Sequence, residues 1–188
     1  MNFFELFILA VALSMDAFAV AICIGLSMQK VSIKKALIVG LYFGIFQAVM
    51  PLIGYFTTTL FADKIVVYGY WIAFGLLAIV GGKLIFESFK KEECKDEYSL
   101  SITQMLPLAF ATSIDALAVG ASFAFIQVNI IPAVLLIGIT TLIISILGVK
   151  IGSLFGSRFK SKAQLIGGII LLLIGLRILL EHYGIISF

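Results

Sequence analysis

Charge is scarce in this 188-residue chain, and histidine and cysteine are scarcer still. Charged residues make up 12% of the sequence, against roughly a quarter in an ordinary soluble domain. One histidine and two cysteines exclude a soft-metal site built from several imidazoles and thiolates. Cys23 falls in an apolar segment and Cys94 in a charged one, so we expect free thiols. A G-x-x-x-x-G-K-[ST] motif is also absent, which excludes a P-loop ATPase.

Apolar residues are correspondingly abundant. They account for 62% of the chain, and the mean hydropathy is +1.21. A run of about 20 apolar residues is long enough to cross a bilayer as a helix. The sequence therefore predicts an all-α integral membrane protein in the lipid bilayer, with six transmembrane helices near residues 3–28, 36–62, 66–89, 104–126, 131–155 and 163–183.

Basic residues are distributed unequally between the two sets of loops. The first, third and fifth loops hold nine of them, whereas the loops on the opposite side hold only Lys64. Cytoplasmic loops are enriched in Lys and Arg, so we expect the odd-numbered loops in the cytoplasm and both termini outside. This topological signal also accounts for the net charge of +3, and nucleic-acid binding is not predicted.

The chain contains an internal repeat. LAVALSMDAFAV at Leu9 is followed 99 positions later by LAFATSIDALAV at Leu108, with eight of twelve residues identical. GGKLIFE, beginning at Gly81, is similar to GLRILLE at Gly175. We infer two three-helix repeats, 1–89 and 104–188, joined by a charged cytoplasmic linker at 90–103. Because three is odd, the second repeat must be inverted relative to the first, as in many secondary transporters.

An aspartate lies in the middle of each repeated segment. Asp16 and Asp115 are both predicted at mid-membrane, where a charged residue costs roughly 2.5–3.5 kcal/mol on insertion scales and usually serves function. A protonated aspartate in an interhelical hydrogen bond is the alternative, but duplicated packing helices would not require a duplicated carboxylate. Two facing carboxylates need a cation or protons between them, and carboxylate oxygens suit Mg, Ca and Mn.

Further oxygen ligands for a metal are available close to these aspartates in the sequence. The predicted metal-binding residues are Asp16, Asp115, Gln47, Ser14 and Ser113. Gln47 is equally open to interpretation as a helix-packing residue.

Two pairs of opposite charge recur in the third and sixth apolar segments. Lys83 precedes Glu87 by four residues, and Arg177 precedes Glu181 by four, a spacing at which side chains can pair along a helix. We interpret them as anchors near the helix ends, with symmetric gates as the alternative.

The duplicated S-M-D-A-F-A-V and S-I-D-A-L-A-V, the F-G-x-F-Q-x-x-M-P-x-x-G of the second segment and the G-G-K-x-I-x-E of the third resemble the bacterial manganese efflux pump family over the whole chain. The resemblance implies a multi-pass exporter in the bacterial cell membrane that lowers intracellular Mn²⁺. It also places Asp16 and Asp115 at the family's paired membrane aspartates. Mn²⁺ would be the transported substrate, and no cofactor is implied.

Other functions remain open on the sequence alone. An exporter of another divalent cation or of a small cationic solute would use the same carboxylates. A membrane-embedded enzyme or a structural membrane protein is less consistent, because no nucleophile and base occur at a recognisable spacing. Exchange with protons is the simplest driving force for a metal exporter without a nucleotide site. Association of two copies as a homodimer is also left open.

Overall fold

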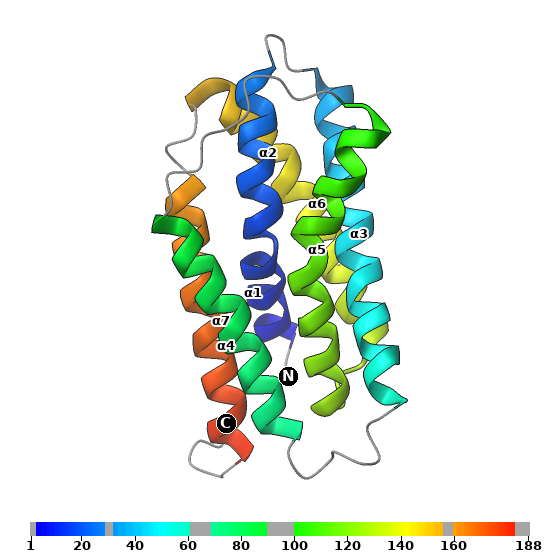
Figure 1. The fold of residues 1–188 in the computed structure, drawn as a ribbon, viewed down its shortest axis with the longest axis vertical. Helices are drawn as coiled ribbons and strands as arrows, with labels where there is room; N and C mark the ends of the chain where they lie inside the picture. Colours follow the sequence, from blue (N-terminus) through cyan, green and yellow to red (C-terminus); the bar gives the residue numbers. More distant parts are fainter. Residues whose placement is uncertain (1–2, 29–31, 61–68, 90–99, 156–159, 183–188) are drawn as a thin grey trace.

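Helices make up all the regular structure in the residues that the structure describes, which are 3–28, 32–60, 69–89, 100–155 and 160–182. Figure 1 shows these helices, from a computed structural model, as one bundle. They are α1 Phe3–Leu13, α2 Met15–Ser27, α3 Ile33–Thr59, α4 Gly69–Phe89, α5 Ile102–Phe125, α6 Ile130–Phe155 and α7 Lys160–His182.

Each of the six predicted apolar segments is helical over most of its described residues, which confirms an all-α fold with six helical segments. The first segment consists of two helices, because α1 and α2 meet end to end at Ser14. Together these two helices, and α3, α5 and α6 individually, are long and apolar enough to cross a membrane. The apolar stretches of α4 and α7 are shorter, Tyr70–Lys83 and Gly168–Leu180, although both helices exceed 20 residues and so match the roughly 30 Å of a hydrocarbon core.

Helices at corresponding places in the two halves run in opposite directions. In Figure 1, α1 and α2 run upward, α3 downward and α4 upward, whereas α5 runs downward, α6 upward and α7 downward. The chain begins and ends its helical part in the lower half of this view. The C-terminal ends of α2, α4 and α6 all lie in the upper half of this view.

The two halves are interlocked. The most extensive helix contacts pair α3 with α5 and α6, α2 with α6, and α4 with α7. The pattern is matched between the halves: α1 and α2 together pack on α6 and α7, and α5 packs on α3 and α4. The helices of each half therefore pack mainly against helices of the other half.

Glycines allow these interhelical contacts to be close. A Cβ on Gly81 of α4 would lie 2.7 Å from the carbonyl oxygen of Gly168 of α7. A Cβ on Gly44 of α3 would lie 2.9 Å from that of Gly138 of α6. Without a strong hydrophobic effect between helices in lipid, such close packing is a main source of helix association.

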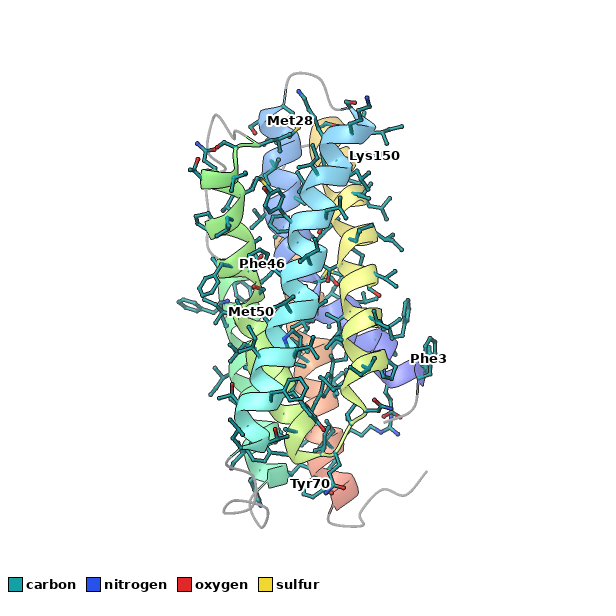
Figure 2. All side chains as sticks on the ribbon, turned by 90° about the vertical axis from the view of Figure 1, so that its right-hand side faces the viewer. Phe3, Met28, Phe46, Met50, Tyr70 and Lys150 are labelled. Atoms are coloured by element: carbon teal, nitrogen blue, oxygen red, sulfur yellow. The ribbon has the colours of Figure 1, made fainter. Side chains whose placement is uncertain are left out.

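The outer surface is apolar, as a membrane protein requires. On α3, Ile45, Val49 and Ile53 are exposed, and on α6 so are Leu135 and Ile139. The spacing of three to four residues places these side chains in stripes along one face of each helix. Figure 2 shows side chains projecting outward along the two helices.

Cys23 corrects one expectation from the sequence. This residue is 3% exposed and is disulfide-bonded rather than a free thiol. Its position in an apolar helix did not indicate a disulfide, because free cysteines are often buried in such positions. Cys94 lies outside the described residues.

The connection between α5 and α6 is short and contains a left-handed residue. Gln127 has φ 54°, and the N–H of Val128 donates to the carbonyl oxygen of Phe123 at 3.0 Å. This is the 6→1 bond of a Schellman-type helix end, whose left-handed position favours glycine. A residue with a Cβ costs about 1–2 kcal/mol in this conformation.

We expect Gln127→Gly to stabilise the protein by about 0.5–1 kcal/mol, because glycine adopts the left-handed conformation without the Cβ penalty. The thermal unfolding midpoint in detergent should rise by a few degrees. Gln127→Ala is the matched control, since it removes the same polar group but keeps the Cβ. Equal midpoints for the two variants would contradict this explanation.

Candidate metal-transport site

The break between α1 and α2 lies at the first repeated serine. Ser14 is fully buried, and its hydroxyl donates to the carbonyl oxygen of Ala10 at 2.6 Å. It also shares a hydrogen bond of 2.8 Å with the hydroxyl of Thr141 on α6. A serine that bonds back to the preceding turn commonly bends a helix, and here a second helix fixes its position.

Gln47 and Asp16 both lie next to this break. The Gln47 side-chain amide donates from α3 to the carbonyl oxygen of Leu13 at 3.0 Å, the last residue of α1. Asp16 falls in the first turn of α2, where the positive end of the helix dipole favours a carboxylate. Because of the break, Asp16 lies at the N-terminus of a helix.

Lys83 brings the two aspartates together. Its ammonium lies 2.8 Å from Oδ2 of Asp115 on α5 and 3.5 Å from Oδ2 of Asp16 on α2. The two carboxylates, which are ninety-nine positions apart in the sequence, are therefore separated by no more than the sum of these distances. Three helices, α2, α4 and α5, converge on a single cationic group.

Burial differs among the three charged residues. Each aspartate side chain is 9% exposed, whereas the Lys83 side chain is 38% exposed. The carboxylates thus lie inside the bundle and Lys83 reaches them from its periphery. An aspartate pair in this environment is stable only with positive charge nearby, and the lysine supplies it.

The structure places the predicted ligands in three different arrangements. Asp16 and Asp115 share one partner, as described above. Ser14 and Gln47 hydrogen-bond around the helix break, and the Ser113 hydroxyl donates to the carbonyl oxygen of Phe110 in its own helix at 3.0 Å. A hydroxyl that donates still offers oxygen lone pairs, so the assignment of all five residues as metal ligands stays a prediction.

Sequence reasoning missed two residues at this site. The sequence alone favours Lys83 as a helix-end anchor or gate, whereas in the structure its ammonium contacts both aspartates. Its position within an apolar stretch, aligned with Arg177 of the second repeat, was the available signal. Thr141 was overlooked, although the adjacent pair Thr140 and Thr141 interrupts an apolar segment.

A second ion pair involves the repeat counterpart of Lys83. Arg177 on α7 contacts Glu5 on α1 at 2.7 Å, with side-chain exposures of 39% and 13% respectively. This pair joins the first and last helices. The side chains of Glu87 and Glu181, the predicted partners of Lys83 and Arg177, lie outside the described residues.

The chemistry of the site suits a hard cation. No group of three or more His, Cys, Asp or Glu side chains converges among the described residues. A metal ion between Asp16 and Asp115 would therefore complete its coordination with neutral oxygens and water. Mg²⁺ and Mn²⁺ accept such ligands, and Mg²⁺ usually keeps several of its waters.

Several helices that are long and apolar enough to cross a membrane define a multi-pass membrane protein. The family model described as "Putative manganese efflux pump" matches residues 30–179. Proteins named "Putative manganese efflux pump MntP" are similar over nearly the whole chain. The one from Acetivibrio thermocellus is 57% identical, covering 100% of this chain and 96% of its own length. Those from Desulfitobacterium hafniense and Campylobacter jejuni are 55% and 51% identical, each covering 97% of this chain and 97% and 98% of their own lengths.

The chain belongs to the manganese efflux pump family. This is a family of transporters and not of enzymes, and no cofactor is indicated. No solved structure matches the chain.

Proposed function

We propose that this protein exports Mn²⁺ from the cytoplasm by exchange with protons, through a site that contains Asp16 and Asp115. The observation that carries the proposal is the shared ammonium, because a cation is already held by carboxylates from two separate helices. The names of the relatives supply the metal.

The basic loops give the orientation. The helix ends that flank the first, third and fifth loops lie in the upper half of Figure 1, and in the sequence these three loops hold nine basic residues. By the positive-inside rule this end faces the cytoplasm. This orientation predicts both termini on the outer side of the cell membrane. The Glu5–Arg177 pair then lies in the half of the bundle that faces outward.

We propose inverted three-helix repeats, 1–89 and 104–188, as the basis of transport. Two observations support this assignment. Corresponding helices run in opposite directions in Figure 1. In addition, α1 and α2 contact the last two helices of the second half, just as α5 contacts the last two helices of the first half. In transporters of this kind the site lies between the repeats near the midplane. Asp16 comes from the first helix of one repeat and Asp115 from the first helix of the other.

Metal export requires a driving force. Moving one charge against the membrane potential costs about 2.3 kcal/mol per 100 mV, so a divalent cation costs about twice as much before any concentration gradient is considered. A passive channel would therefore admit Mn²⁺. Two carboxylates that hold either one divalent ion or two protons would couple export to inward proton movement, because the loaded site is close to neutral in both cases.

The test is Mn²⁺ flux in liposomes with an imposed pH gradient and a clamped voltage. We expect the rate to increase with protons supplied on the side opposite to the metal, and protons to move in return. Flux that ignores the gradient, with no proton movement, would contradict proton coupling. A panel of divalent cations in the same liposomes tests which metal is transported. Preference for another cation would leave the proposed site in place but show that Mn²⁺ is not its main substrate.

A further inference from the structure

We infer that Lys83 is the built-in counter-ion of the transport site: its ammonium holds the two aspartates when no metal is bound and is displaced when Mn²⁺ enters. This inference rests on the proposed function of Asp16 and Asp115. It adds a residue from a third helix, α4, that would compete with the substrate for the same two oxygens.

The geometry supports competition. The Lys83 ammonium lies 2.8 and 3.5 Å from one Oδ2 atom of each aspartate, which is the region a bridging metal would occupy. A divalent cation and an ammonium repel each other strongly at such distances in a partly dry site. Metal and ammonium therefore cannot both remain between the carboxylates.

The lysine is suited to leave. Its side chain is 38% exposed, whereas those of the aspartates are 9% exposed. A lysine has a flexible four-carbon stem and a compact charge. The ammonium can therefore withdraw toward the periphery of the bundle along α4 while the carboxylates stay in place.

The charge count indicates what the competition achieves. Two carboxylates alone have a charge of −2, and with the ammonium the group has a charge of −1. In proton exchange the site returns to the cytoplasm with bound protons, and the cost of moving charge through a low-dielectric region increases steeply with its magnitude. Lys83 thus lowers the negative charge that these protons must neutralise, and it also favours metal release.

Removing the lysine should consequently strengthen binding and slow turnover. We expect Lys83→Met to bind Mn²⁺ at least about tenfold more tightly than the wild type, because the competing cation is gone. Net efflux should fall at least tenfold, because bound protons alone must then neutralise both carboxylates before the metal-free site returns. Exchange of Mn²⁺ for isotopic Mn²⁺ should persist, since it does not require the metal-free site to reorient.

Three measurements on the full-length protein test this inference. Mn²⁺ binding is followed in nanodiscs by loss of the electron paramagnetic resonance signal of free Mn²⁺. Net efflux and isotope exchange are measured in liposomes. Lys150→Met is the matched control, because Lys150 is an exposed lysine of α6 near the upper end of the bundle in Figure 2. Lys83→Arg keeps the charge and should bind Mn²⁺ no more tightly than the wild type.

The outcomes distinguish this inference from the proposed function. Tighter binding with preserved exchange in Lys83→Met supports the counter-ion role, and a misfolded variant could not produce a gain in affinity. Unchanged or weaker binding in Lys83→Met, while the wild type binds Mn²⁺ through both aspartates, would overturn the inference alone. If the wild type neither binds nor exchanges Mn²⁺, the proposed function itself is wrong.

Discussion

Asp16→Asn and Asp115→Asn are each expected to abolish Mn²⁺ export. Asparagine keeps the size and hydrogen-bonding capacity of aspartate but removes the negative charge. Changing an outer-shell partner of a metal site typically costs 10- to 100-fold in affinity, so losing one of two carboxylate ligands should weaken Mn²⁺ binding by more than about 100-fold. Binding in nanodiscs and flux in liposomes measure the two effects.

Glu5→Gln is the matched control for these variants. It makes the same carboxylate-to-amide change in an ion pair with Arg177, which is separate from the pair of aspartates held by Lys83. We expect Mn²⁺ binding by Glu5→Gln to stay within a few-fold of the wild type. Normal binding and export in both aspartate variants would instead assign Asp16 and Asp115 to helix packing.

The second large effect is expected from Gly120→Ala. A Cβ at this position of α5 would overlap the main-chain atoms of Pro51 on α3, and neither backbone can yield without separating the two helices. Overpacking of this kind typically costs about 1–3 kcal/mol. Because Asp115 lies on the same helix, export should decrease together with the thermal unfolding midpoint.

Gly75→Ala provides the comparison. A Cβ at Gly75 of α4 would meet nothing within 4 Å, so the change adds helix propensity without a clash. Its unfolding midpoint should equal or exceed that of the wild type. Equal midpoints for Gly120→Ala and Gly75→Ala would show that the contact between α3 and α5 does not limit stability.

Much of this architecture could be predicted because a bilayer imposes simple length and polarity requirements. The six apolar segments identified the helices, and the duplicated aspartates identified the two carboxylates that share Lys83. The break at Ser14 could not be predicted from local sequence, because Ser113 occupies the equivalent place in an unbroken α5. Thr141 reaches Ser14. Gly40 and Gly54 of α3 align with Gly138 and Gly152 of α6, so the α3 residue that corresponds to Thr141 is Phe43, which has no hydroxyl.

The direction in which the Lys83 side chain points could not be predicted from the sequence either. A lysine on a membrane helix can extend to the interface or turn inward, and only the rotation of α4 against α2 and α5 determines which occurs. Its counterpart Arg177 pairs with Glu5 instead. Similar sequence in two halves therefore predicted equivalent positions but not equivalent contacts.

The interlocked halves also bear on how the protein is made. Helices α2 and α3 pack chiefly on α5 and α6, and α4 packs chiefly on α7. In each case the earlier helix is synthesised and enters the bilayer before its partner. During that interval their glycine-lined faces are covered only by lipid, which offers no matching surface. Assembly is therefore completed only when the last helix is inserted, and ribosomes that stop early would leave unpartnered helices for membrane quality control.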